Sequence, residues 1–136
     1  MDKIYFWKDK EKGVVDPILF SKTAENFAKK IAEEHEESKG KKSNKRTQIR
    51  KFYDEVLRLD MDAKSKKYNW EDIIPLVHML TAKAAYANGR DKLVSDRFLV
   101  FIKDSVEQIQ DAKDLTLFAN FFEAFMGFYR LYGPKN

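Results

Sequence analysis

Lysine and arginine side chains are concentrated in one stretch of the chain, and the chemistry they could do is phosphate binding. Residues 39–67 contain 11 basic and 4 acidic side chains, whereas residues 1–38 contain 7 and 9 and residues 68–136 contain 8 and 9. The whole excess behind the net charge of +4 therefore lies in this stretch. A concentrated basic block indicates a polyanionic partner, because several donors can contact a phosphate backbone at once.

Three residues of this block are expected to form the centre of an RNA-binding face. Arg46, Arg50 and Lys51 lie off the apolar stripe of the helix predicted there, and Arg46 and Arg50 are one turn apart. Lys42, Lys45 and Lys67 are predicted to give outer support. The alternative interpretation of the same charges is an ordinary solvated helix face.

The chain lacks the residue sets of the common enzyme chemistries. It has no cysteine, which excludes disulfides, thiolate catalysis and cysteine-ligated zinc. Its 5 glycines are scattered, so there is no glycine-rich phosphate loop. Carboxylates such as Asp54 and Glu55 have basic neighbours at helical spacing, which is typical of surface pairs. We therefore predict no catalytic activity, no metal and no cofactor.

The 2 histidines give no stronger signal. His35 lies among four glutamates, and a solvated acidic face is expected there rather than a weak metal site. His78 lies in an apolar stretch and is expected to be a satisfied or partly exposed core histidine.

The elements that must position the basic residues are helices. Apolar residues recur at helical spacing in five stretches, and neither strand alternation nor a hairpin signal appears. The fold class predicted is all-α, a compact bundle of about five helices. The helices are expected from Asp16-Pro17, over residues 44–59, over residues 70–89, from Asp91, and over residues 114–132. A mobile breaker at residues 39–43, a polar loop at residues 60–69 and a left-handed cap at Gly89 complete this prediction.

The domain organisation expected is a loose N-terminal arm, residues 1–15, and a single helical domain, residues 16–136. The arm carries an apolar knot at residues 4–7, which is predicted to dock on a groove of this domain or of a neighbour. We expect no signal peptide, because residues 1–4 contain no basic stretch followed by an apolar one, and no apolar run approaches the roughly 20 residues of a membrane span. The cytoplasm is the expected location.

Two helices are unusually apolar. The helix over residues 70–89 is apolar almost all round, which predicts a place in the middle of the bundle. In the helix over residues 114–132 the apolar arc is roughly 240° wide, and it is explained either by a central core helix or by a subunit interface at one edge. If the second explanation holds, the isolated protein should self-associate as a dimer. Polar replacements of Phe128 and Tyr129 should then weaken this association more than they weaken folding.

Three sequence blocks resemble the small subunit of the type III-A CRISPR effector, the Csm complex. The first is Lys45-Arg46-Thr47-Gln48-Ile49-Arg50-Lys51-Phe52. The second is Lys83-Ala84-Ala85-Tyr86-Ala87-Asn88-Gly89-Arg90-Asp91, and the third runs from Phe121-Phe122-Glu123-Ala124-Phe125 to Tyr129. The resemblance covers about residues 44–133 and rests on three blocks in the same order.

This resemblance implies a non-catalytic helical subunit, present in stacked copies along the guide RNA–target RNA duplex beside the other subunits of the effector. It implies RNA contacts by Arg46, Arg50 and Lys51 from the first block and by Lys83 and Arg90 from the second. Arg90 could instead form a buried or half-buried pair with Glu123, since both belong to family-like blocks. Two other classes remain open: a helical scaffold that makes only protein–protein contacts, and a small metal-dependent nuclease.

Overall fold

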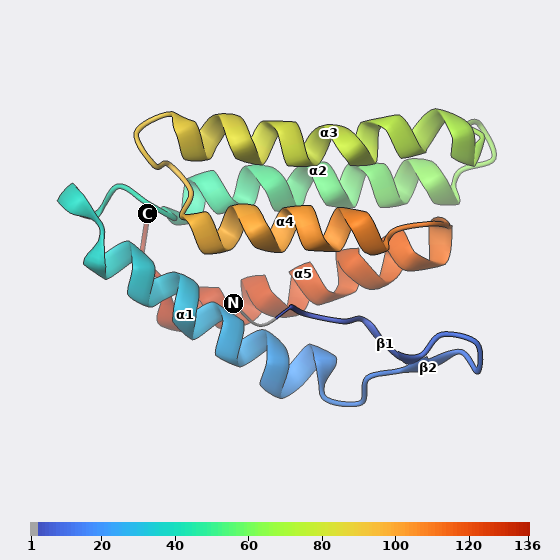
Figure 1. Ribbon diagram of the computed structural model, residues 1–136, viewed down its shortest axis with the longest axis horizontal. Helices are drawn as coiled ribbons and strands as arrows, with labels where there is room; N and C mark the ends of the chain where they lie inside the picture. Colours follow the sequence, from blue (N-terminus) through green and yellow to red (C-terminus); the bar gives the residue numbers. More distant parts are fainter. Residues whose placement is uncertain (1–2) are drawn as a thin grey trace.

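The computed structural model describes residues 3–136 and is dominated by five α-helices, as predicted. They are α1 (Ala24–Glu37), α2 (Arg46–Lys64), α3 (Trp70–Gly89), α4 (Asp96–Gln108) and α5 (Ala112–Tyr132). A π-helical turn, η1 (Leu19–Thr23), leads into α1, and a 3₁₀ turn, η2 (Lys39–Lys41), follows it. The helices lie side by side, with α3 at one edge of the bundle and α1 at the other (Figure 1). The all-α prediction is confirmed.

α5 is the central helix of the bundle. It packs against both α1 and α2, and its rings Phe118, Phe121, Phe122 and Phe125 are fully buried. The Phe122 ring centroid lies 5.9 Å from that of Phe101 on α4 and 5.7 Å from that of Phe125. Such pairs add to the stabilisation that their buried area gives. The wide apolar arc of α5 is therefore mainly core, and Tyr129, suggested above as an interface residue, is fully buried.

The expectation that α3 lies in the middle of the bundle is wrong. α3 packs on α2 and α4 and leaves its outer side open, so that Leu76, Met79 and Tyr86 are exposed. Alanine and proline account for much of the apolar character of that outer side, with Pro75, Ala82 and Ala85 all exposed. Small residues raise the apolar count of a helix without requiring burial. His78 is likewise exposed rather than part of the core.

α2 is longer than its predicted range, because residues 60–64 continue the helix instead of forming a loop. Asp60 is buried and accepts a hydrogen bond from Thr116 Oγ1 at 2.7 Å, and Lys64 Nζ lies 3.0 Å from its other oxygen. Arg58 pairs with Asp62 at 3.3 Å, one turn away. These charges stabilise the helix through pairs four residues apart, so their polarity does not mark a loop.

α4 begins at Asp96 and not at Asp91. Ser95 caps it, its side chain accepting from the Phe98 amide. Asp91 and Lys92 adopt left-handed backbone angles, with φ of 54° for both, whereas Gly89 remains within α3. The turn between α3 and α4 therefore places its unusual backbone two and three residues later than predicted.

The segment between α1 and α2 ends in a buried polar junction. His35 is buried and its Nδ1 lies 2.8 Å from the Ser43 carbonyl, so the predicted solvated acidic face is wrong at this residue. Asn44 is fully buried, with φ of 61°, a conformation that asparagine tolerates well. It exchanges hydrogen bonds with Ser95 on α4 and accepts one from the Tyr129 hydroxyl on α5. This junction, which we call the Asn44 junction, fixes the start of α2 and leaves residues 39–42 on the surface.

The N-terminal segment packs on the bundle rather than forming a loose arm. Strands β1 (Trp7–Asp9) and β2 (Val14–Val15) form a short antiparallel hairpin beside α5, and Phe6 is fully buried against Phe118 and Phe121. Gln108 Nε2 donates to the Ile4 carbonyl at 2.7 Å. The apolar knot therefore docks on this chain itself, and residues 1 and 2 of the predicted arm lie outside the described residues.

Asp114 fastens the hairpin to the first turn of α5. Its carboxylate is fully buried and accepts hydrogen bonds from the Trp7 indole at 2.8 Å, from Lys10 Nζ at 2.8 Å and from the Gln110 amide at 2.9 Å. Burial alone would raise the pKa of Asp114, but the donors from Lys10, Gln110 and Trp7 outweigh it and lower the pKa below its ordinary value of 3.8. The charged form is therefore the one that the folded protein stabilises.

The replacement Asp114→Asn is expected to reduce the free energy of unfolding at neutral pH. It should also make that free energy depend less on pH. A lowered folded pKa gives stability that is present above the unfolded value and lost as pH falls through the folded one. Urea unfolding at pH about 7 and about 3 should show a smaller difference for the variant than for the wild type. An unchanged pH dependence would show that the carboxylate does not fasten the hairpin.

Among residues 3–136, none of the helices combines the length and apolar character that crossing a membrane requires.

Candidate nucleic-acid interface

Three of the predicted RNA-binding residues meet in one groove between α2 and α3. Lys51 lies on the α2 side, and Lys83 and Arg90 lie on the α3 side. The groove has a volume of about 320 Å³, and the residues that complete its lining are Gln48, Phe52, Glu55, Leu80, Tyr86, Ala87 and Leu93. It forms because α2 and α3 run antiparallel, which sets the first turns of α2 beside the last turns of α3 (Figure 1). Two blocks about thirty residues apart in sequence thus contribute cations to one surface.

The cations of the groove differ in whether they form ion pairs within the chain. Glu55 accepts from Arg58 Nη2 at 2.6 Å and from Lys83 Nζ at 3.3 Å. The Arg58 hydrogen bond is the main cause that holds the pKa of Glu55 below its ordinary value, so Glu55 stays charged. Within residues 3–136 neither Lys51 nor Arg90 belongs to an ion pair, and both are exposed. These two cations are available to an anionic ligand, whereas Lys83 is partly neutralised.

Arg46 and Arg50 do not share this groove. Arg50 is exposed on α2, with its Nε 3.8 Å from Asp54 one turn away. Arg46 is half-buried against the end of α5, where its Nη2 donates to the Arg130 carbonyl at 3.2 Å. Its Nε is buried without a hydrogen-bond partner. Arg46 is expected to lie off the apolar stripe of its helix, but the end of α5 packs against it and part of its guanidinium is structural.

The outer lysines lie in two separate places. Lys42 and Lys45 precede α2 at the same end as Arg50 and Lys51, with Lys42 exposed and Lys45 half-buried. Lys67 is exposed beyond the opposite end of α2. Nineteen residues of helix separate the two groups, a rise of about 28 Å. Of the eight predicted residues, three line the α2–α3 groove, four others lie near the start of α2, and Lys67 lies beyond its far end.

Tyr86 and Gln48 belong to the groove but were not predicted as site residues. Tyr86 is 68% exposed, although it is a large aromatic side chain in an apolar helix. The signal that could have found it is its spacing, since Lys83, Tyr86 and Arg90 follow one another at three and four residues and therefore share a helix face. Gln48 lies three residues before Lys51 and follows from the same rule.

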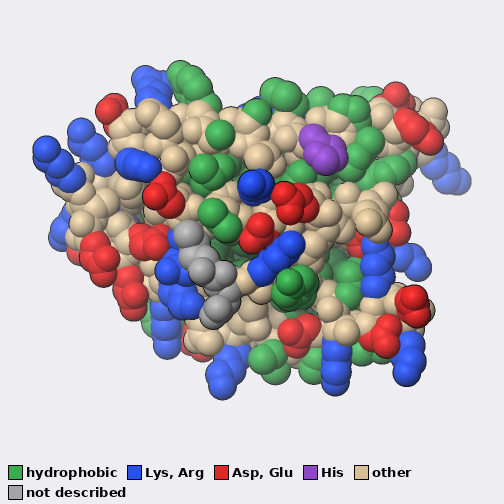
Figure 2. All heavy atoms as spheres, in the orientation of Figure 1, with side chains coloured by type: hydrophobic (Ala, Val, Ile, Leu, Met, Phe, Trp, Pro, Cys, Tyr) green, Lys and Arg blue, Asp and Glu red, His purple; other side chains and the backbone are tan. Residues whose placement is uncertain are grey.

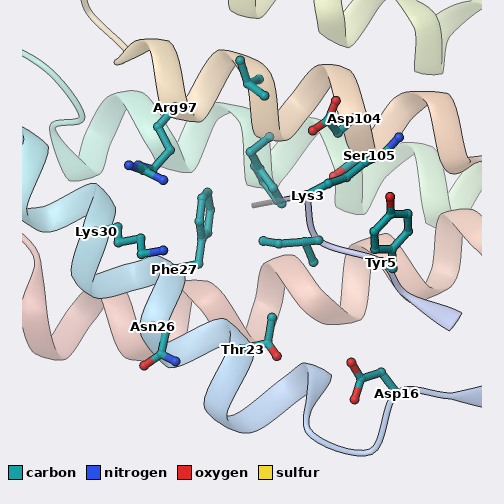
Figure 3. A pocket seen from close by; sticks show the side chains of 13 residues that line it. Lys3, Tyr5, Asp16, Thr23, Asn26, Phe27, Lys30, Arg97, Asp104 and Ser105 are labelled. Carbon is teal, nitrogen blue, oxygen red and sulfur yellow. The ribbon is translucent and has the colours of Figure 1, made fainter. Parts of the chain in front are cut away.

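A second hollow lies between α1, α4 and the N-terminal segment and has a volume of about 300 Å³. In Figure 3, Lys30 and Arg97 lie on one side of it and Tyr5 and Asp104 on the other, with the Phe27 ring between them. Arg97 is already held by Glu34 at 2.9 Å. The lining of this hollow therefore contains both cations and carboxylates, and the face on which it opens carries both signs (Figure 2). A polyanion is better matched by the α2–α3 groove.

The proposed pair between Arg90 and Glu123 is not formed in the described part of the chain. Arg90 lines the α2–α3 groove, whereas Glu123 is exposed on α5 and belongs to no ion pair there. Arg90 is thus an exposed cation at the groove and not part of a buried pair. Residues 3–136 also contain no cluster of three or more histidine or carboxylate side chains that could hold a metal ion.

The family model described as Csm2 Type III-A matches residues 21–135. No curated protein and no solved structure matches the chain. The matched range includes all three sequence blocks and both sides of the α2–α3 groove.

Proposed function

We propose that this chain binds RNA through the α2–α3 groove. The chain belongs to the Csm2 Type III-A family and is thus a small subunit of the type III-A Csm complex. In this proposal it lines the guide RNA–target RNA duplex and has no catalytic role of its own. Family membership implies association with other Csm subunits. Self-association into dimers or stacked copies is part of the proposal, and the cytoplasm remains the expected location.

The observation that carries the proposal is the meeting of Lys51 and Arg90 on one groove without acidic partners in residues 3–136. An exposed cation that is free of ion pairs can neutralise a phosphate without first breaking a contact. Arginine suits this role because its planar fork can hold a phosphate by two hydrogen bonds. Arg50, Lys42 and Lys45 extend the positive surface around the start of α2.

The mechanism proposed is phosphate neutralisation with release of counterions. Contacts of this kind position the nucleic acid but carry no sequence information, which base pairing with the guide already supplies. Each subunit could then bind weakly while several stacked copies bind strongly, because linked contacts act at high effective concentration.

The double replacement Lys51→Ala with Arg90→Ala should weaken binding equally for unrelated single-stranded RNA sequences. The slope of log affinity against log salt should become shallower by about 1.4, from about 0.7 for each of two phosphate contacts. The measurement is a salt titration of RNA binding by fluorescence anisotropy, for the isolated chain and for the reconstituted complex. The matched control is Lys103→Ala with Lys113→Ala, two exposed lysines on α4 and α5.

Each alternative gives a distinct result in the same titration. Wild-type affinity and an unchanged salt slope in the double variant would favour a scaffold that contacts only protein neighbours. Shortening of the RNA by the purified chain in the presence of Mg²⁺, and not in its absence, would favour a nuclease. A pull-down from native cells should recover guide RNA together with other Csm subunits.

A further inference from the structure

Tyr86 is the residue of the α2–α3 groove whose chemistry phosphate binding does not use. Its ring stands on the rim of the groove, 68% exposed, between Lys83 one turn before it and Arg90 one turn after it. Lys51 lines the same groove from α2. An aromatic ring is therefore set among three cations on the surface where we place the RNA.

Within residues 3–136 the Tyr86 side chain has no partner of its own. Its hydroxyl makes no hydrogen bond, and its ring belongs to no aromatic pair and lies under no cation. Tyr132, which is also exposed, differs in both respects, because its hydroxyl donates to Glu25 at 2.6 Å and Lys29 lies over its ring at 5.0 Å. The hydroxyl and ring of Tyr86 thus make no polar, aromatic or cation contact within residues 3–136, although exposing such a ring to water is unfavourable.

Proteins bind single-stranded nucleic acid by combining a basic groove that follows the backbone with aromatic rings on which bases stack. We infer that Tyr86 stacks on an unpaired base of the RNA held in the α2–α3 groove, while Lys51 and Arg90 contact the flanking phosphates. The inference rests on the proposed function. It requires a nucleotide that is left unpaired in or beside the guide RNA–target RNA duplex, since the faces of paired bases are covered by their neighbours.

Stacking and phosphate binding respond differently to salt and to the bases of the RNA. A phosphate contact adds to the salt slope, whereas a stacked ring displaces no counterion. Stacking also tolerates any base, because every base has a π-face. The inference therefore predicts a loss of affinity in Tyr86→Ala without any change in salt slope, and a loss that vanishes when the RNA carries no bases at the bound position.

The test uses the reconstituted complex with the variant in every copy, and the isolated chain in parallel. Tyr86→Ala should weaken binding of single-stranded RNA by about 5- to 150-fold per site, and Tyr86→Phe should retain near wild-type affinity because the ring is kept. The matched control is Tyr68→Ala, an exposed tyrosine beyond the opposite end of α2. RNA with abasic positions should bind wild type and Tyr86→Ala equally.

A second measurement locates the contact directly. RNA containing 4-thiouridine, irradiated in the wild-type complex, should crosslink to a peptide that contains Tyr86. Absence of that crosslink, together with wild-type affinity in Tyr86→Ala, would overturn the inference.

The remaining outcomes separate this inference from the proposed function. If Lys51→Ala with Arg90→Ala reduces the salt slope but Tyr86→Ala changes nothing, RNA binding stands and stacking fails. If neither variant changes RNA affinity, the proposed function fails. If Tyr86→Ala leaves RNA affinity intact and weakens assembly of the complex, the ring is a protein contact together with its exposed neighbours Leu76 and Met79.

Discussion

Replacing Tyr129 with alanine is expected to lower the free energy of unfolding by about 3–5 kcal/mol, the range for removing a large buried ring. Tyr129 is fully buried on α5 and stacks on Phe125 with ring centroids 5.2 Å apart. Its hydroxyl donates to the Asn44 carbonyl at 2.5 Å. Burial raises the pKa of Tyr129 well above its ordinary value, so the hydroxyl keeps its proton and remains a donor at any working pH.

Two further variants show where this loss comes from: one separates the ring of Tyr129 from its hydroxyl, and the other compares Tyr129 with its neighbour. Tyr129→Phe keeps the ring but leaves the Asn44 carbonyl without its donor, which should cost about 1–3 kcal/mol. Phe128→Ala removes a neighbouring ring that is only partly buried, so its effect should be smaller than that of Tyr129→Ala. Urea unfolding followed by circular dichroism measures all three. Equal losses for Phe128→Ala and Tyr129→Ala would contradict the central position of Tyr129.

The Asn44 junction makes Tyr129 important for the groove as well as for the core. Asn44 comes two residues before α2, and it is tied to α4 through Ser95 and to α5 through Tyr129. A change at Tyr129 would therefore shift the start of α2 and, with it, the cations around Lys51. For that reason RNA binding has to be tested with exposed residues, whose replacement leaves this junction intact.

The helical elements could be predicted from the sequence because their signals are local. α3 begins after Asn69, whose side chain forms a capping box with Asp72, and α5 ends where Gly133 and Pro134 follow. The stripe of α4, including Phe98 and Phe101, is buried as its spacing indicates. Caps and periodicity depend on residues within a few positions of one another, and those are visible in a single chain.

The features that could not be predicted depend on partners far away in the sequence. β1 and β2 have three and two residues, too few for strand alternation to show. The sequence around Asp60 indicates a loop, but Asp60 is helical and accepts a hydrogen bond from Thr116, fifty-six positions later. The sequence indicates that Arg46 is a surface cation, but its guanidinium donates a hydrogen bond to the last turn of α5. Long-range contacts decide each of these cases.

The candidate site shows the same division. The motif blocks contain Lys51, Lys83 and Arg90, which the structure brings together at one groove. They cannot reveal that Glu55 partly neutralises Lys83, or that Tyr86 completes the rim, because both facts depend on how α2 packs against α3. The sequence could therefore identify the candidate cations. Which of them are free of ion pairs depends on how the helices pack.

Reversing the charges of Lys51 and Arg90 with glutamate is expected to weaken RNA binding far more than the same change at the other end of α2. Two lost charge-assisted contacts at about 1.5–3 kcal/mol each correspond to a loss of roughly 100-fold or more per subunit. Added repulsion between glutamate and phosphate acts in the same direction, and the loss should be larger still in the complex, where every copy carries it.

The matched comparison is Lys66→Glu with Lys67→Glu, which introduces the same change of charge beyond the end of α2. Along the helix between the two sites, Arg58 is neutralised by Glu55 and Asp62, and Lys64 by Asp60. An RNA strand leaving Lys51 therefore meets no free cation until Lys66 and Lys67, a rise of about 20 Å or more along the helix. Because exposed charges that far apart are largely screened at physiological salt, the distal pair should cost only a few-fold. Equal losses from both pairs, measured by anisotropy at the same salt concentration, would mean that the RNA follows the whole length of α2 and that its binding is not centred on the α2–α3 groove.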